Sequence, residues 1–494
     1  MLQLFQKAKI YAQKTAIVSN GGSYTYQQLL FASQQLAALL LDRTSDLKEQ
    51  RIAFLVEPGF DYVRVQWGIW QAGGIAVPLC ITHPLPSLQY VIEDTEASAI
   101  VVSPSFREVL QGYAEDKTIR FVVLEPENDR KPAELPEIDK SRRAMILYTS
   151  GTTNLPKGVV TTHANLEAQI STLVAAWGWT SADHTLCILP LHHVHGIINV
   201  VSCALWSGAV CEFLPSFSTE KVFDLFAASR LNVFMAVPTI YFKLIAHFES
   251  LDEGEQQRLT AAMKRFRLMV SGSAALPVSV MEKWETISGH RLLERYGMTE
   301  IGMAISNPYV GERKAGFIGL PLPGVSIRLA DEANIKLADT SEPGEIQVKG
   351  PNVFKEYWRK PEATTTSFTT DGWFKTGDIA EVEHGYYKIL GRNSVDIIKS
   401  GGYKISALEI EEVLRSHPAV SDCAVVGLPD EEWGETVAAA IVGDASLDTE
   451  ELTPWLKARM PGYRVPRKYL SLSELPRNAM GKVTKNDVKK LFNT

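Results

Sequence analysis

Short apolar runs alternate with segments of helical spacing along the first third of the chain. The runs have the length of buried strands and lie at residues 52–56, 75–79, 99–102 and 121–124. Between them, residues 62–72 carry apolar side chains at helical spacing, as do residues 29–40 before the first run. Strands that alternate with helices at such short intervals predict a parallel sheet covered by helices, so we expect an α/β fold.

The pattern continues and then changes toward the C-terminus. A helix is expected at 219–229 and a strand at 233–237, followed by β-rich segments at 344–351 and 372–378. From residue 394 onward the expected elements are smaller: strands at 403–405, 420–426 and 437–442, and helices at 407–416 and 449–459. Since 494 residues exceed what one hydrophobic core usually serves, we expect a large α/β domain with a β-rich subdomain at 1–392 and a small, mobile α+β lid at 393–494.

The composition is that of a globular enzyme. Hydrophobic residues make up 45% and charged residues 22% of the chain, and the formal net charge is −7. This charge argues against a general nucleic-acid-binding protein, and it means that any anionic nucleotide or coenzyme has to be met by local basic groups. No apolar run approaches the length of about 20 residues that spans a bilayer, so we expect no stable membrane insertion.

The cysteines and the N-terminus bear on the compartment. The five cysteines form no C-x-x-C pair, which favours a reducing environment. The first ten residues are amphipathic and mildly basic, without a signal-peptide core or an arginine-rich run. We therefore expect a surface helix and a cytoplasmic protein, with organelle targeting by this segment as the alternative.

Residues 147–159 form a loop that is rich in hydroxyl groups and glycine and that follows a short apolar strand. Its sequence is L-Y-T-S-G-T-T-N-L-P-K-G-V, so Lys157 follows a run of small polar residues and glycine: Thr149, Ser150, Gly151, Thr152 and Thr153. Hydroxyl and backbone N–H groups in such a loop can surround phosphate oxygens, and the lysine adds a mobile positive charge. It is not a Walker A motif, because the lysine precedes its glycine and no G-K-[ST] follows. An isolated loop of this kind is also compatible with a polar surface hairpin.

A second motif, L-E-R-Y-G-M-T-E, occupies residues 293–300. The face of Tyr296 can stack on an adenine, the hydroxyl of Thr299 can reach a phosphate, and the carboxylate of Glu300 can hold Mg²⁺ between phosphates. Each role is only weakly indicated when it is considered alone. The two motifs in this order are specific.

Together the motifs resemble the signatures of the adenylate-forming superfamily, which comprises acyl-CoA synthetases, firefly-type luciferases and the adenylation domains of peptide synthetases. The resemblance extends over nearly the whole chain and implies ATP, Mg²⁺ and coenzyme A as ligands, with Glu300 and Thr149 as metal ligands. It implies catalytic roles for four residues: Lys157, Thr299, Glu300 and Lys482. It implies nucleotide contacts from both motifs and from a turn similar to the family's G-G-A-x-L segment: Thr149, Ser150, Gly151, Thr152, Thr153, Ser273, Ala274, Glu294, Tyr296, Gly297 and Met298.

Further segments fit the same resemblance. Asp378 can accept hydrogen bonds from both ribose hydroxyls, and the resemblance places Arg392 near the ribose. Lys482, in P-R-N-A-M-G-K, is similar to the catalytic lysine of the lid. The segment that faces the coenzyme A tunnel after the lid rotates is implied to be Gly401, Gly402 and Tyr403. The hinge residue is left open, because the span after Arg392 is one residue longer than in most relatives.

Three histidines within four positions, at 192, 193 and 195, raise the question of a metal site. Their spacing does not fit one, since helical ligand pairs prefer i,i+4 and no cysteine or carboxylate lies nearby in the sequence. One interpretation is a helix start with packed rings. The segment P-L-H-H-V-H-G also resembles the family motif that borders the acyl pocket, which implies substrate contacts from His193 and His195, and we expect Ser271 beside them.

Arg295 lies just before Y-G-M-T-E, where most relatives carry a neutral residue. One interpretation ties its guanidinium to Glu294 or another acid. The other is that the guanidinium binds a second substrate carboxylate in an otherwise apolar pocket, because a buried arginine without an anion is a costly unpaired charge. E-R-Y-G-M-T-E followed by S-N-P-Y-x-G-x-R is similar to malonyl-CoA synthetases, which favours malonate as the substrate.

The expected reaction is therefore AMP-forming ligation of malonate to coenzyme A through an acyl-AMP, without a protein nucleophile. Another small acid, such as methylmalonate, succinate, or a short-chain or aromatic carboxylate, is the alternative within this class. A luciferase-like oxygenase or a carrier-loading adenylation enzyme is less favoured. A non-catalytic nucleotide sensor is disfavoured because the four residues that the chemistry needs are present: Lys157, Glu300, Asp378 and Lys482.

Overall fold

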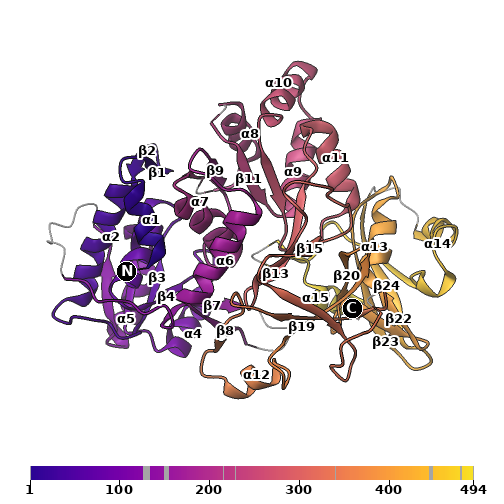
Figure 1. Ribbon diagram of the computed structural model, residues 1–494. Helices are drawn as coiled ribbons and strands as arrows, with labels where there is room; N and C mark the ends of the chain where they lie inside the picture. The colour runs from indigo at the N-terminus through magenta and orange to yellow at the C-terminus, as the bar shows by residue number, and fades with distance from the viewer. Residues whose placement is uncertain are drawn as a thin grey trace.

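The structure is a computed structural model (Figure 1) that describes residues 2–125, 134–149, 155–214, 216–228, 230–339, 341–443, 449–478 and 481–492. Helices and sheets alternate through the first part of the chain, which confirms the α/β prediction. In these ranges no helix is both long and apolar enough to cross a membrane.

The first sheet is built by the alternating segments at the start of the sequence. Seven strands of the described residues pair in the order β18-β8-β7-β4-β3-β5-β6, and the strands from β4 to β6 are parallel. Their bounds are Arg51–Leu55 (β3), Ile75–Pro78 (β4), Ala99–Val102 (β5), Arg120–Val123 (β6), Arg143–Thr149 (β7), Lys157–Thr162 (β8) and Glu356–Tyr357 (β18).

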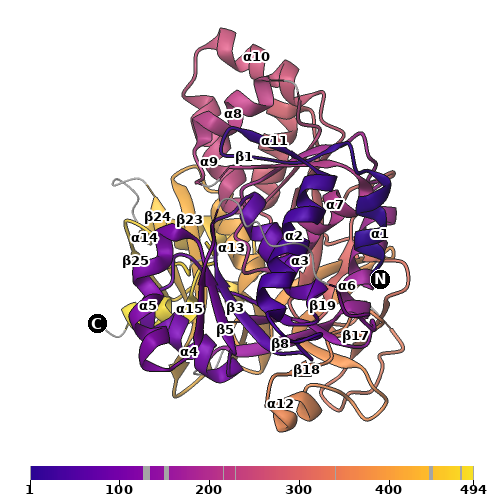
Figure 2. The same ribbon diagram turned by 90° about the vertical axis from the view of Figure 1, so that its left-hand side faces the viewer.

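This sheet buries both of its faces. On β3, Ile52 and Phe54 pack with helices α2 (Tyr26–Leu41) and α3 (Phe60–Gln71), whereas Ala53 and Leu55 pack with α4 (Leu85–Thr95) and α5 (Arg107–Asp116). Figure 2 shows α2 and α3 on one side of β3, with α4 and α5 on the other side. Because successive side chains of a strand point to opposite faces, a sheet covered on both sides needs the continuous apolar runs seen in the sequence.

A nine-stranded sheet of the described residues carries the strands that lead into the predicted site. Its order is β15-β14-β13-β12-β11-β9-β10-β1-β2, and the strands from β13 to β1 run parallel. The strands are Thr15–Ser19 (β1), Gly22–Thr25 (β2), His184–Cys187 (β9), Val210–Phe213 (β10), Val233–Ala236 (β11), Leu268–Ser271 (β12), Leu293–Met298 (β13), Gly302–Ser306 (β14) and Leu320–Pro321 (β15).

Helices cover this second sheet on both sides as well. One face packs on α8 (Thr219–Ala227), α9 (Pro238–Glu249), α10 (Glu253–Met263) and α11 (Val278–Ser288). The other face shares its apolar core with the first sheet through α1 (Gln3–Ile10), α6 (His163–Ala176), the π-helix η2 (His195–Ser202) and α7 (Cys203–Ser207). The two sheets are therefore joined by a shared layer of helices, visible between them in Figure 1.

Two further sheets follow along the chain. A four-stranded antiparallel sheet contains β16 (Ser326–Ala330), β17 (Gly344–Lys349), β19 (Phe374–Glu383) and β20 (Tyr386–Arg392), and α12 (Pro361–Thr366) lies near it in sequence. The last sheet contains β21 (Ile397–Ser400), β22 (Tyr403–Ser406), β23 (Val420–Asp430), β24 (Gly434–Gly443) and β25 (Lys468–Ser471). With helices α13 (Ala407–Arg415), α14 (Thr449–Lys457) and α15 (Lys485–Leu491) it has apolar clusters of its own.

Candidate active site

The two sequence motifs and the C-terminal lysine meet at one end of the nine-stranded sheet. Strands β12 and β13 are parallel neighbours with Ser271 opposite Glu294, so the segments that follow them leave the sheet at the same edge, where α/β folds bind ligands. Lys482 lies on a loop with access to solvent, yet its ammonium group is close to Arg295 and Arg392. Loss of hydration and these two positive charges lower the pKa of Lys482, while Asp378 and Glu300 oppose the shift.

Arg295 presents a buried guanidinium. The residue is 3% exposed, and its Nε and Nη2 atoms have no hydrogen-bond partner in the described part of the chain. Burial lowers the pKa of Arg295 to about 9, an effect that Glu294 opposes. The guanidinium lies against Gly272, where any Cβ atom would collide with it. The turn after β12 is thus shaped to leave room for this side chain.

Glu294 does not pair with Arg295, although the two are neighbours in sequence. Residues in succession on a strand point to opposite faces, and the Oε1 atom of Glu294 accepts a hydrogen bond from the backbone N–H of Leu276 at 3.1 Å. Among the described residues, no ion pair or hydrogen bond joins the two side chains. Burial raises the pKa of Glu294 to about 8, so this carboxyl group holds the 271–277 turn while largely protonated at neutral pH.

The raised pKa of Glu294 predicts a pH-dependent stability. The folded protein keeps this proton up to about pH 8, whereas an unfolded glutamate releases it near the ordinary value of 4.5. The contribution of Glu294 to stability is therefore fully present below about pH 4.5 and declines as the pH rises toward 8. We expect Glu294→Gln, which cannot titrate, to gain thermal stability relative to the wild type between pH 5 and pH 8. Glu362→Gln, which changes an exposed residue, serves as the control. The same dependence of Tm on pH in all three proteins would contradict the raised pKa of Glu294.

Two uncharged histidines lie near Arg295. His195 is 1% exposed, and its Nδ1 atom lies 3.1 Å from the Oγ atom of Ser273. Burial, with Arg295 as the next contribution, lowers the pKa of His195 well below its usual range. The pKa of His193 is lowered in the same way by burial and then by the charge of Lys482. His193 also accepts a hydrogen bond at Nδ1 from the backbone N–H of His195, at 3.2 Å, where η2 begins.

The residues predicted to hold the ribose are already linked to one another. The hydroxyl of Tyr296 donates to Oδ2 of Asp378 at 2.6 Å, and Nε of Arg392 donates to Oδ1 of Asp378 at 3.2 Å. Asp378 and Arg392 face each other across strands β19 and β20. Burial raises the pKa of Asp378, while the charge of Arg392 opposes the shift. This network joins the Y-G-M-T-E segment to the four-stranded sheet.

The predicted metal ligand Glu300 lies beside a tyrosine that the sequence did not point to. Its Oε1 atom accepts a hydrogen bond from the hydroxyl of Tyr357 at 2.9 Å, and burial raises the pKa of Glu300. The Nζ atom of Lys157 lies 5.2 Å from the centre of the Tyr357 ring. Tyr357 is on β18, which pairs with β8 of the loop motif, and only this tertiary pairing brings it to the site.

The other predicted residues differ in burial, and four of them lie outside the described residues. Thr149 faces Lys157 across the β7–β8 hairpin, whereas Ser150, Gly151, Thr152 and Thr153 lie outside the described residues. Thr299 and Ser271 are buried, Met298 is half-buried and Ala274 is exposed. A side chain at Gly297 would collide with the Gly302 carbonyl group, so this position needs glycine to keep strands β13 and β14 together.

The segment predicted to face coenzyme A is not at the site in this structure. Gly401, Gly402 and Tyr403 are exposed at the turn between β21 and β22. The C-terminal part of the chain contributes Lys482 instead. The turn after Arg392 is held by Asp396, which accepts a hydrogen bond from the Arg392 backbone N–H at 2.9 Å and pairs with Lys485 at 2.6 Å. Neither Asp396 nor Lys485 belonged to a motif that the sequence analysis used.

The described ranges contain no group of three or more His, Cys, Asp or Glu side chains that could hold a metal ion. The histidines at 192, 193 and 195 therefore form no such site there. The single buried carboxylate of Glu300 fits Mg²⁺, because this ion is usually held by one or two carboxylates together with substrate phosphates and water.

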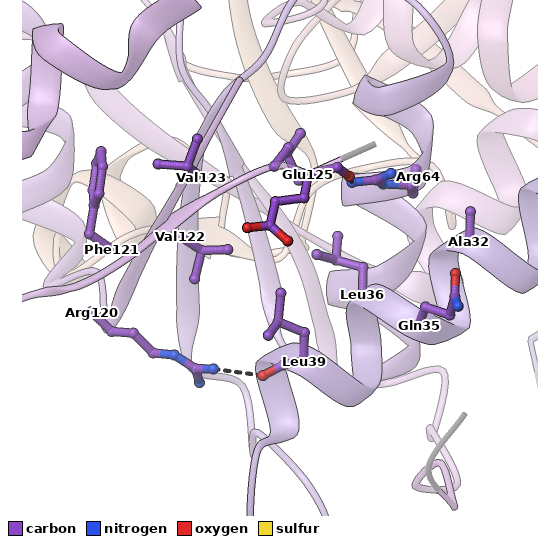
Figure 3. A pocket seen from close by; sticks show the side chains of 11 residues that line it. Ala32, Gln35, Leu36, Leu39, Arg64, Arg120, Phe121, Val122, Val123 and Glu125 are labelled. Carbon is purple, nitrogen blue, oxygen red and sulfur yellow. Dashed lines mark hydrogen bonds between the residues drawn. The ribbon is translucent and has the colours of Figure 1, made fainter. Parts of the chain in front are cut away.

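A cavity of about 390 Å³ lies apart from these residues, between α2, α3 and β6 (Figure 3). Leu36, Arg64, Arg120 and Glu125 are among the side chains that line it. None of the residues lining it was predicted to bind substrate or nucleotide, and it plays no part in the site.

Comparisons with known proteins agree with the motifs. The chain matches the family model of AMP-binding enzymes over residues 4–358 and the model of the C-terminal domain of AMP-binding enzymes over residues 409–482. The mitochondrial malonate–CoA ligase ACSF3 of Xenopus laevis is 43% identical, in an alignment covering 99% of this chain and 91% of the relative. The malonate–CoA ligase of Arabidopsis thaliana is 41% identical, with 98% and 87% covered.

Solved structures give the same result. The crystal structure of ATP-bound MatB from Rhodopseudomonas palustris superposes with a TM-score of 0.91 at 34% identity, over 100% of this chain and 99% of that chain. The o-succinylbenzoate CoA synthetase MenE of Bacillus subtilis, in complex with its acyl-adenylate, gives a TM-score of 0.86 at 27% identity, with 99% and 97% covered. The predicted resemblance and fold class are confirmed, and this chain belongs to the family of AMP-binding enzymes.

Proposed function

We propose that the protein is an ATP-dependent malonate–CoA ligase that forms malonyl-AMP and then malonyl-CoA, with release of pyrophosphate and AMP. The observation that carries the proposal is the buried guanidinium of Arg295, whose Nε and Nη2 atoms lack partners in the described part of the chain. The relatives from Xenopus laevis and Arabidopsis thaliana, 43% and 41% identical, are both malonate–CoA ligases by name and support the same substrate.

The charge balance of the pocket explains why a short diacid fits. Desolvating a guanidinium without an anion is costly, and a carboxylate bound to both arms of the fork offsets that cost. The lowered pKa values of His193 and His195 keep both rings neutral, so one carboxylate suffices to neutralise Arg295. The second carboxylate of malonate, one carbon away, remains free to react.

The first half-reaction joins malonate to AMP. An oxygen of the reacting carboxylate attacks the α-phosphorus of ATP, a new O–P bond forms, and pyrophosphate leaves with the electron pair of the broken bond. Lys482 and Thr299 stabilise the negative charge that grows on the α-phosphate, and Lys157 contacts the phosphates. Burial and the positive charges of Arg295 and Arg392 lower the pKa of Lys482 in the free protein. The negative charges of the bound substrates would offset these positive charges.

The remaining predicted contacts hold the nucleotide. Tyr296 offers its face to adenine, Asp378 and Arg392 meet the ribose, and the 149–153 loop surrounds the phosphates. The turn at Ser273 and Ala274 and the strand end at Gly297 and Met298 contribute backbone contacts. Glu300 and Thr149 would hold Mg²⁺, which would neutralise charge on the phosphates.

The second half-reaction requires the lid, for which we propose residues 393–494. Rotation about the turn after Arg392 withdraws Lys482 and brings Gly401, Gly402 and Tyr403 to the coenzyme A tunnel. The thiolate of coenzyme A attacks the acyl carbon, a C–S bond forms, and AMP leaves as the C–O bond breaks. No protein side chain acts as the nucleophile.

Pyrophosphate release measured over a panel of acids, with and without coenzyme A, tests the proposal. We expect the highest kcat/KM with malonate, lower values with methylmalonate and succinate, and little turnover with aromatic or simple short-chain acids. A higher kcat/KM with one of these other acids would show that this acid, and not malonate, is the preferred substrate. Pyrophosphate release without any thioester would favour a luciferase-like or carrier-loading enzyme, and no release with any acid would favour a nucleotide sensor.

For the compartment we propose the cytoplasm. All five cysteines are buried and unpaired, as in proteins of reducing compartments. The relatives named ACSF3 are mitochondrial, so fractionation of cells that produce the full-length protein distinguishes the two locations.

A further inference from the structure

A side chain of the C-terminal domain contacts the start of α11, directly after the 271–277 turn. The Oε1 atom of Glu412, on α13, accepts a hydrogen bond from the backbone N–H of Val278 at 3.0 Å. Glu412 lies within the part of the chain that matches the C-terminal domain of AMP-binding enzymes, whereas Val278 lies within the part that matches the large domain. Because the turn is one of the segments proposed to contact the nucleotide, this hydrogen bond joins the C-terminal domain to the nucleotide site.

The first turn of α11 has no capping group of its own. Its N-cap residue is Pro277, without a side-chain capping hydrogen bond, and no acidic residue lies in the first turn. The N–H groups at the start of a helix need acceptors from elsewhere, and the helix dipole favours a negative charge there. Glu412 provides the acceptor and, when ionised, the charge. The amide before Pro277, that of Leu276, donates to Glu294, so carboxyl groups from two domains hold the N–H groups on either side of the proline.

The carboxyl group of Glu412 is held at both oxygen atoms. Its Oε2 atom lies 3.9 Å from Nη1 of Arg415, three residues further along α13. Burial raises the pKa of Glu412, while Arg415 and the Val278 N–H oppose the shift. The charge of Glu412 also adds to the effect of burial in raising the pKa of Glu294. The position of the C-terminal domain therefore affects the protonation of the carboxyl group that holds the 271–277 turn.

We propose that Glu412 is a positioning residue that holds the C-terminal domain in the arrangement that places Lys482 at the site, an inference that rests on the proposed function. In this structure the Lys482 ammonium group lies close to Arg295 and Arg392 while Glu412 is bound to Val278. A rotation that withdraws Lys482 would also carry Glu412 away from α11, because both residues belong to one domain. The Glu412 side chain is 38% exposed, so water can solvate the carboxylate once the contact opens. The contact thus favours adenylation and opposes the change to the second half-reaction.

The rates of the two half-reactions in Glu412→Ala and Glu412→Gln test this inference. Pyrophosphate release without coenzyme A measures adenylation, and thioester formation from a supplied synthetic acyl-adenylate measures the second step. We expect Glu412→Ala to slow adenylation by about 2- to 30-fold, the effect of losing one helix cap, and to leave thioester formation unchanged or faster. Glu412→Gln keeps an acceptor for the Val278 N–H but loses the charge, so its loss of adenylation rate should be smaller.

Two comparisons separate positioning from a general effect on the fold. The control variant Glu332→Gln breaks an exposed ion pair with Lys404 of the C-terminal sheet, 2.7 Å long, and should change either rate by no more than about twofold. The second comparison is Glu412→Ala in the Lys482→Ala background. If Glu412 acts by placing Lys482, its loss should not slow adenylation further once the lysine is absent.

The other outcomes would each overturn the inference. If Glu412→Ala slows both half-reactions to the same extent, the residue supports the fold of the C-terminal domain and has no positioning role. The full loss of rate in the Lys482→Ala background, or adenylation at the wild-type rate in both Glu412 variants, would exclude the role as well. Failure of the proposed function would show in the wild type, which would then prefer another acid, and the variants are compared on the acid that the wild type prefers.

Discussion

Arg295→Gln is expected to lower kcat/KM for malonate by about 10²–10⁴-fold, because removing one partner of a buried ion pair costs about 3–5 kcal/mol. The guanidinium is 3% exposed, so water cannot replace it as the partner of the distal carboxylate. A monocarboxylate such as propionate has no group for Arg295 to bind, and its slow turnover should change little or improve. Pyrophosphate release with both acids measures the two effects in one assay.

Two controls accompany this prediction. Arg295→Lys keeps the charge but loses the planar fork, so an intermediate kcat/KM for malonate is expected. Thermal unfolding of the ligand-free Arg295→Gln protein should show an unchanged or higher Tm, because the variant removes a desolvated charge that has no partner at Nε and Nη2 in the described residues. If Arg295→Gln turned over malonate at the wild-type rate, Arg295 would not be the residue that binds the distal carboxylate. The adenylating chemistry would be unaffected by that result.

Lys482→Ala is expected to slow adenylation by about 10²–10³-fold, the usual effect of removing one donor that stabilises transition-state charge. Thioester formation from a supplied synthetic acyl-adenylate should stay near the wild-type rate, because the proposed rotation of the lid would withdraw the lysine in that half-reaction. The ammonium group shares its surroundings with Arg295, Arg392, Asp378 and Glu300, which is where the reacting groups of both substrates would meet.

The matched control for Lys482 is Lys490→Ala, which removes an exposed lysine of α15 that pairs only with Asp487 at 2.7 Å in the described structure. Both half-reactions should be unaffected in that protein. Equal losses in the two half-reactions of Lys482→Ala would show that the residue supports the fold of the lid instead of the first step alone.

The strands of the first sheet could be predicted because burial on two faces leaves a direct mark on the sequence. The runs at 52–55 in β3 and at 99–102 in β5 are apolar at every position, and each face meets its own set of helices. Helix α10 left no comparable mark. Its segment E-G-E-Q-Q-R-L-T-A-A-M buries only Leu259, Ala262 and Met263, so its apolar stripe is too narrow to be recognised without the neighbouring helices.

The candidate site also contains both residues that the sequence pointed to and residues that it did not. Tyr296, Thr299 and Glu300 were predicted because one short motif contains all three, and Arg295 stood out as a charge where most members of the family carry a neutral residue. Tyr357 and Asp396 were missed because their roles depend on partners far away in the sequence: Tyr357 donates to Glu300, and Asp396 pairs with Lys485. A contact between distant segments leaves no pattern in either segment alone.

By itself, the sequence determined that this chain builds an adenylate-forming enzyme, since the two motifs and the terminal lysine carry the required chemical groups in the required order. It left open whether Arg295 pairs with Glu294 or with a substrate. The tertiary structure excludes the pair with Glu294 in the described residues, because adjacent residues of β13 point to opposite faces and Glu294 accepts a hydrogen bond from the backbone N–H of Leu276. Burial then leaves two nitrogen atoms of the guanidinium without partners in the described chain, and such burial arises only when separate strands pack together.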